Sequence, residues 1–292
     1  MALEDKDSEV RESALAKLTD QASLASLART AHDSKARCAA VAKLTDQPLL
    51  AESVLDTGDE YVRRAAFGRL TDEAIFARVA LEAEGLPSIA SYYRRDSVER
   101  LTDQTLLARL ALNSTAPETR ALTIEKLCDP ELLAKIASSK ADPETRSAAL
   151  KKVTNQALLA RMAVEDEDRE VRAAAVEGLM DQPLLARIAV EDDDPRVRAT
   201  AVERLADQAL LARLAVEDED PWIRRTAADR LVDHELRAVS AAEGEDKWVR
   251  STAPQRLLVK DVLTRLTVED NDSSVRRVAA LRMAKLTDHS DR

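Results

Sequence analysis

The chain has 292 residues with 54 acidic and 44 basic side chains, a net charge of −10 that disfavours binding to the phosphates of DNA or RNA. Hydrophobic residues make up 45% and aromatic residues only 2%, so the chain can fold, but on a core of Leu, Val and Ala. Its two cysteines are too few for a disulfide framework and fit a cytoplasmic location. We see no signal peptide and no apolar run of about 18 residues, and expect no membrane segment.

A motif of the form Leu-Thr-Asp-Gln recurs along the chain and defines its repeats. Strong and weak copies begin at Leu18, Leu44, Leu70, Leu101, Leu127, Val153, Leu179, Leu205, Leu231, Leu257 and Leu286. The spacing is 26 residues, except for five inserted residues before Leu101 and three before Leu286. A fixed period of this kind indicates a repeat array, and we expect it to form a single domain over residues 1–292.

The sequence pattern of each unit predicts two short helices, a first and a second, in the same order along the chain. In the unit 181–205, Asp181 is the N-cap of the first helix, and an acidic stretch ends that helix. Asp194 is the N-cap of the second helix, whose apolar residues Val197, Ala201, Val202 and Leu205 lie on one face. Helices of two to three turns are not stable alone in water, so each must pack on neighbouring units.

The run Asp-Pro-x-Val-Arg-x-x-Ala-Val-x-x-Leu at Asp194–Leu205 resembles the second helix of HEAT-like repeats, in particular the short bacterial type found in phycobilin (PBS) lyases. The chain is also similar to the leucine-rich-repeat variant but lacks the cysteine-rich iron–sulfur segment of that family. The resemblance covers the whole chain. It implies an all-α, right-handed α-solenoid, a superhelix of about eleven 26-residue two-helix repeats.

Two stretches depart from the pattern. Residues 82–100 contain the insertion Glu-Gly-Leu-Pro at 84–87 and place Asp96 and Ser97 where other units have small core residues. Residues 247–260 contain Pro254 inside the second helix and lack the turn motif. We expect a change in superhelical curvature at each, and relaxed packing constraint is an equal alternative.

An arginine follows the first core position of the second helix in every unit, beside the buried stripe. These arginines are Arg11, Arg37, Arg63, Arg94, Arg120, Arg146, Arg172, Arg198, Arg224, Arg250 and Arg276. Asp is the N-cap in nine units, at Asp7, Asp33, Asp59, Asp142, Asp168, Asp194, Asp220, Asp246 and Asp272. The resemblance implies that these residues form an Asp/Arg ladder that joins successive units. A row of ligand-binding arginines is the alternative.

The exposed face of the second helices carries the candidate binding residues. Aromatic and arginine side chains, which are enriched at binding hot spots, gather on two parts of it. One patch comprises Trp222, Arg225, Trp248 and Arg277, and the other Tyr61, Arg64, Tyr92 and Arg95. In HEAT-like solenoids this face is concave. The alternative is that a first-turn aromatic packs only on the adjoining loop.

The sequence offers no catalytic constellation. His32, His234 and His289 lie in different units without metal-ligand spacing, and phosphate-binding and nucleophile motifs are absent. Carboxylates recur in the loops of several units, which favours helix caps over a tuned acid–base pair. We therefore expect no catalytic residue, no metal and no cofactor.

The favoured interpretation is a non-enzymatic scaffold that binds a protein or peptide. One alternative is an enzyme or enzyme subunit, since some HEAT-like proteins act in phycobilin attachment or on alkylated DNA. Another is a designed or duplicated array without a dedicated partner, because residues 153–204 hold two nearly identical units. Neither end resembles a polar solenoid cap, so we also expect a longer array or self-association through the ends.

Overall fold

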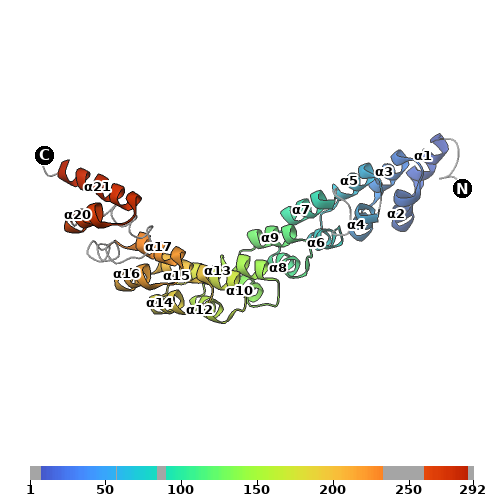
Figure 1. Cartoon of the computed structure of the whole chain (residues 1–292). Coiled ribbons are helices and arrows are strands. Elements are labelled where there is room, and N and C mark those ends of the chain that lie inside the picture. Colours follow the sequence, from blue (N-terminus) through green and yellow to red (C-terminus); the bar gives the residue numbers. More distant parts are fainter. Residues whose placement is uncertain (1–7, 57, 84–89, 233–259, 289–292) are drawn as a thin grey trace. The chain divides into compact units, whose positions relative to one another are not determined.

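The computed structural model describes residues 8–56, 58–83, 90–232 and 260–288 (Figure 1). These residues form α-helices joined by short loops, and no β-strand occurs among them. Close packing divides the chain into two units, Met1–Ala141 and Asp142–Arg292, which we describe separately. Successive helices pack in pairs, so the prediction of an all-helical α-solenoid array is confirmed.

The helices are short and regular. The first unit contains α1 (Ser8–Lys17), α2 (Gln21–Thr30), α3 (Ser34–Lys43), α4 (Gln47–Asp56), α5 (Glu60–Phe67), α6 (Glu73–Glu82), α7 (Ala90–Arg100), α8 (Gln104–Asn113), α9 (Pro117–Lys126) and α10 (Pro130–Ala137). The second contains α11 (Pro143–Leu150), α12 (Gln156–Glu165), α13 (Arg169–Gly178), α14 (Gln182–Glu191), α15 (Pro195–Arg204), α16 (Gln208–Glu217), α17 (Pro221–Arg230), α20 (Lys260–Glu269) and α21 (Ser273–Asp288).

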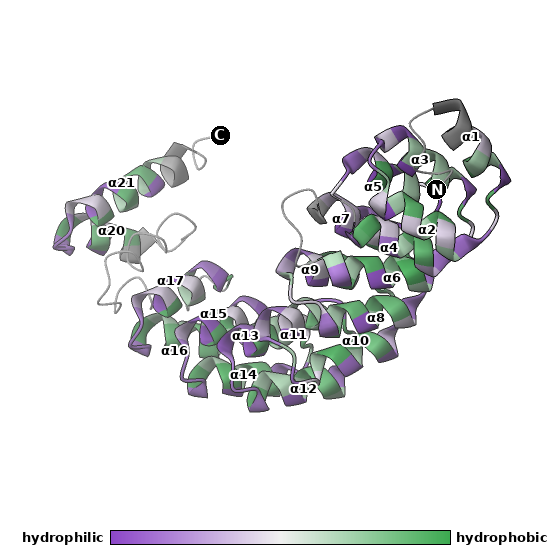
Figure 2. Ribbon diagram, turned by 90° about the vertical axis from the view of Figure 1, so that its right-hand side faces the viewer, coloured by the Kyte–Doolittle hydropathy of each residue, from purple (hydrophilic) through white to green (hydrophobic). Residues whose placement is uncertain are grey.

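Within each of the two units, a first helix, with an even label, packs on the second helix that follows it. Thus α2 packs on α3 and α14 packs on α15. Second helices also pack on one another in succession, as α11, α13, α15 and α17 do in the second unit (Figure 1). The helices carry both apolar and polar residues, as one-sided burial requires (Figure 2).

The repeat 181–205 folds as its pattern predicts. Asp181 accepts a hydrogen bond from the N–H of Leu184 at 3.0 Å, and Asp194 accepts one from the N–H of Arg196 at 2.8 Å. Each carboxylate thereby satisfies an N–H group that has no partner within its own helix. The predicted core residues Val197, Ala201, Val202 and Leu205 are fully buried.

Leu, Val and Ala make up most of the core of the described residues, as expected, and aromatic residues join them at one place. Phe67, Phe76 and Tyr93 are buried on α5, α6 and α7. The ring centroid of Phe67 lies 4.9 Å from that of Tyr93 and 5.7 Å from that of Phe76, in edge-to-face geometry. The Arg100 guanidinium lies 4.9 Å from the Phe67 centroid, within range for a cation–π contact. These four residues, named the aromatic cluster below, fill the interior between α5, α6 and α7.

The ladder arginines join successive repeats, as Arg172 shows. Its Nη1 donates to the carbonyl of Asp166 in the preceding loop at 3.1 Å. Its Nε and Nη2 donate to both carboxylate oxygens of Asp192 in the next repeat, at 2.8 and 3.0 Å. Asp192 also accepts from the N–H of Asp194 at 2.9 Å. One buried carboxylate therefore holds an arginine of one repeat and the loop of the next.

The other ladder arginines use parts of this pattern. Arg146 pairs with Asp166 at 2.8 Å and Arg198 with Asp218 at 3.4 Å, while Arg37 pairs with Asp59. Main-chain carbonyls at the end of the preceding helix accept from Arg63 and Arg94, and carbonyls of the preceding loop accept from Arg120, Arg224 and Arg276. The side chains of Arg11 and Arg250 lie outside the described residues.

The carboxylate partners in the second unit differ from those that the resemblance implied. They lie two residues before the N-cap, at Asp166, Asp192 and Asp218, whereas the N-cap carboxylates Asp168 and Asp194 accept from helix N–H groups. Asp59 is the exception, since it both caps α5 and binds Arg37. Of the predicted N-caps, Asp7 and Asp246 lie outside the described residues.

In several of the described repeats, a glutamine at the start of the first helix binds the turn of the next repeat. Gln182 Oε1 accepts from the N–H of Ala206 at 2.8 Å, and its Nε2 donates to the carbonyl of Arg204 at 3.2 Å. The same acceptor contact, to a residue 24 positions further on, is made by Gln21, Gln47, Gln104, Gln156 and Gln208. The Leu-Thr-Asp-Gln motif thus combines a core leucine, an N-cap and an inter-repeat contact.

Asp59 gives the first repeats a defined acid sensitivity. Its hydrogen bonds from Arg37 and then from the Ser34 hydroxyl lower the pKa of Asp59 to about 2. The charged form is therefore favoured by folding, and its contribution to stability is present above the ordinary pKa near 3.8 and lost as the pH falls towards 2. We expect Asp59→Asn to lower the melting temperature at pH 6.

The measurement is the melting temperature of both proteins between pH 6 and pH 2. The difference between the parent and Asp59→Asn shrinks as the pH falls through this range, because the parent also loses its charge there. A difference that stays constant down to pH 2 contradicts the assignment. Asp56→Asn, on the exposed end of α4, serves as the control.

Three expectations concern the irregular stretches and the C-terminal end. The insertion at 84–89 and the residues 233–259 lie outside the described residues, so the predicted curvature changes stay predictions. The predicted turn at Leu286 is wrong, because α21 continues to Asp288. That stretch holds strong helix formers and neither Gly nor Pro.

Among the described residues, no helix has both the length and the apolar character needed to cross a bilayer.

Candidate binding surface

The predicted binding residues that the structure describes lie exposed on second helices. Tyr61 and Tyr92, on α5 and α7, are 77% and 62% exposed, and Trp222 on α17 is 49% exposed. The arginines Arg64, Arg95, Arg225 and Arg277 are also exposed. Trp248 lies outside the described residues. Exposure of aromatic side chains to this degree fits a contact surface better than packing on an adjoining loop.

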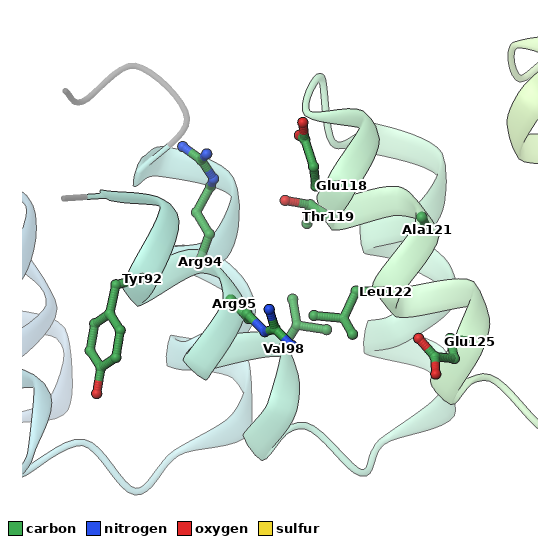
Figure 3. A pocket seen from close by; sticks show the side chains of 9 residues that line it. All are labelled: Tyr92, Arg94, Arg95, Val98, Glu118, Thr119, Ala121, Leu122 and Glu125. Carbon is green, nitrogen blue, oxygen red and sulfur yellow. The ribbon is translucent and has the colours of Figure 1, made fainter. Parts of the chain in front are cut away.

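The structure brings two of these residues together in one hollow, between α7 and α9. This hollow, the α7–α9 groove, has a volume of about 670 Å³. It is lined by Tyr92, Arg94, Arg95, Val98, Glu118, Thr119, Ala121, Leu122 and Glu125 (Figure 3). Tyr61 and Arg64 lie on α5 and do not line it, and Trp222, Arg225 and Arg277 belong to the second unit.

The floor of the groove is apolar and narrow. Val98 on α7 is fully buried, and Leu122 on α9 is half-buried, so it presents part of its side chain to the hollow. The side chains of these two residues approach each other between the helices (Figure 3). Ala121 is small and leaves the space above the floor open. An apolar side chain of a ligand could therefore be removed from water here.

The two walls of the groove carry opposite charges. Arg94 and Arg95 line the α7 side, whereas Glu118 and Glu125 line the α9 side (Figure 3). Arg95 forms an ion pair with Glu99 at 2.8 Å, one turn further along α7, and its side chain remains 74% exposed. Because the pair is exposed, the Arg95 guanidinium can turn towards a ligand at small cost.

The aromatic cluster holds α7 in place beside this groove. The Tyr93 hydroxyl donates to Glu60 Oε1 on α5 at 2.8 Å. Burial, and then the hydrogen bond to Glu60, raise the pKa of the Tyr93 hydroxyl above its usual value, so it stays protonated. Tyr92 makes an edge-to-face contact with Tyr93 at 5.2 Å and points away from α9 (Figure 3). Tyr92 therefore extends the surface towards α5 rather than forming the floor.

Sequence reasoning missed the floor and the acidic wall. The side chains concerned are Val98, Glu118, Thr119, Ala121, Leu122 and Glu125. One signal was present: Leu122 is the only leucine at its position in the repeat, three residues after the first core residue, where neighbouring units have Asp96 and Ala148. A leucine at a position that is small or polar in every other unit except the last, which has Val278, is a reason to expect a special surface.

The second unit has hollows of a different character at the ends of its first helices. One, of about 510 Å³, is lined by Val190, Leu214 and a set of carboxylates that includes Glu191 and Glu217. A similar hollow of about 390 Å³ lies one repeat earlier. Both include ladder residues, so they are a consequence of the stacking that every regular repeat shares.

The described residues offer no arrangement suited to metal chemistry. No group of three or more His, Cys, Asp or Glu in this part of the chain is placed to hold a metal ion. His32 is exposed, and His234 and His289 lie outside the described residues. Burial raises the pKa of the Cys38 thiol, which disfavours its reactive thiolate form.

A comparison of the chain with protein-family models and with curated proteins found no match.

Proposed function

We propose that the protein is a non-enzymatic scaffold that binds a protein or peptide on the exposed face of its second helices, with the α7–α9 groove as the principal site. The proposal rests on one observation: an apolar floor lies between walls of opposite charge in a hollow of about 670 Å³, and the exposed Tyr92 extends the surface towards α5. Binding sites of this size combine an apolar lining with a few placed polar groups.

The repeat type supports the same proposal. A solenoid of the short HEAT-like kind, which the second-helix motif suggests, offers an extended surface of successive helices and places no catalytic demand on any of them. The groove departs from the regular repeat pattern through Leu122 and through the aromatic cluster behind it. Departure from a repeating pattern is expected where one unit has a task that the other units lack.

The test is a selection from a displayed library of random peptides on the intact chain. Leu122→Glu places a charge on the apolar floor without touching a fully buried residue, and we expect it to abolish enrichment of the peptides that the parent selects. Met180→Glu is the matched control, because Met180 is 73% exposed on a turn outside the groove.

Identical peptides enriched by the parent and by Leu122→Glu would overturn the placement of the site. Failure of the parent to enrich any peptide would overturn the proposed function. The patch around Trp222 is compared in the same selection, with Trp222→Ala, since Tyr, Trp and Arg are the residue types that most often dominate binding energy.

A further inference from the structure

The α7–α9 groove has properties that select the conformation and the charge pattern of its occupant. We infer that it accepts an amphipathic helix of a partner protein that carries one apolar ridge, an acidic flank against α7 and a basic flank against α9. The inference rests on the proposed function and names the chemistry of the partner.

The lining argues against an extended peptide. Both walls are α-helices, whose backbone N–H and C=O groups are already paired within the helix. No asparagine or glutamine side chain lines the groove. An extended segment would have to pair its backbone polar groups with the charged side chains of the walls or with water, whereas a helix satisfies these groups internally.

The floor matches a single ridge. Val98 and Leu122 approach each other between the two helices (Figure 3). A third helix that lies in the groove can place apolar residues spaced three and four apart onto this floor. A sheet or a flat protein surface has no comparable ridge.

The walls specify the flanks of that helix. Arg95 presents an exposed guanidinium on the α7 side, where Arg94 also lines the groove, and Glu118 and Glu125 line the α9 side. A helix with two acidic flanks would place carboxylates against the acidic α9 wall. A helix with two basic flanks would place cations against the basic α7 wall. Complementary charges at an interface determine specificity in this way, and like-charge contacts are disfavoured.

The experiment uses four synthetic helical peptides of about 15 residues, longer than α7 with 11 residues and α9 with 10, so that each peptide spans the whole groove. All share the same leucine ridge, and the residues on the two flanks are Glu and Lys, Glu only, Lys only, or Gln only. Binding to the intact chain is measured by fluorescence anisotropy in low salt. We expect the Glu-and-Lys peptide to bind about three- to tenfold more tightly than the Glu-only and Lys-only peptides.

Two variants make the test specific to the walls. Glu118→Gln/Glu125→Gln removes the acidic wall and should improve binding of the Glu-only peptide alone. Arg95→Gln weakens the basic wall and should improve binding of the Lys-only peptide alone. A general loss of structure cannot produce opposite changes with two peptides. In about 1 M salt, where screening acts within about 3 Å, the preferences should disappear.

The outcomes separate the two proposals. Equal affinities for all four peptides, lost in Leu122→Glu, would overturn the charge pattern and leave the proposed function standing. Enrichment of extended, proline-containing peptides in the display selection would overturn the helical occupant. Absence of binding by all four peptides would overturn this inference, and the display selection would then decide the proposed function by itself.

Discussion

Arg172→Ala lowers the free energy of unfolding by about 3 kcal/mol, the cost expected when one partner of a buried ion pair is removed. The Arg172 guanidinium holds both carboxylate oxygens of Asp192, whose side chain is 9% exposed. Without the arginine, this carboxylate keeps the N–H of Asp194 as a partner but loses its compensating charge. The loss appears as a lower urea midpoint and a lower melting temperature.

A comparison within the same repeats isolates the ladder. Arg196→Ala removes an exposed arginine whose ion pair with Glu170 is also exposed, so we expect a change of less than about 1 kcal/mol. Arg198→Ala should lie between the two, because its contact with Asp218 is a single one at 3.4 Å. If Arg172→Ala melted like Arg196→Ala, the ladder would not stabilise the stacking of repeats.

The repeat pattern predicted the architecture because every unit repeats the same amphipathic spacing. The N-cap aspartates, the core stripe and the arginine beside it are periodic, and in the unit 181–205 each lies where the pattern places it. The sequence did not show which carboxylate binds the ladder arginine. Asp192 and Asp194 are two residues apart in an acidic loop, and only the fold shows which carboxylate caps the helix and which binds Arg172.

Contacts between repeats were the main feature that the sequence left hidden. The glutamine of the Leu-Thr-Asp-Gln motif served to define the period, but its bond to the turn 24 residues further on depends on the rise from one repeat to the next. The same holds for the basic residue at the end of the second helix, such as Arg204, which donates to the carbonyl of Leu179. Such contacts join positions that no local pattern relates.

The candidate site was predicted in part for a similar reason. Exposed aromatic and basic residues on the second helices can be read from helical spacing, and Tyr92 and Arg95 were found in this way. The groove also depends on the distance between α7 and α9, and therefore on the aromatic cluster that replaces the usual Val and Ala packing. A periodic pattern predicts least about the irregular repeats. These are also the repeats whose surface can differ from that of the neighbouring repeats.

Phe67→Ala is expected to have an effect as large as that of the ladder variant, in the first unit. Phe67 is 3% exposed and contacts the rings of Phe76 and Tyr93 and the guanidinium of Arg100. Its removal leaves a cavity between three helices, and Phe→Ala changes in cores cost about 3–5 kcal/mol. The measurement is the free energy of unfolding from urea titrations followed by circular dichroism.

Two further variants decide whether the aromatic contacts or the filled volume matter. Phe67→Leu retains most of the volume but loses the edge-to-face contacts, so we expect a cost of about 1–2 kcal/mol. Tyr61→Ala, on the same helix but 77% exposed, should change stability by less than about 0.5 kcal/mol. If Phe67→Ala were as mild as Tyr61→Ala, the cluster would not hold α7 against α5 and α6, and the geometry of the α7–α9 groove would need another cause.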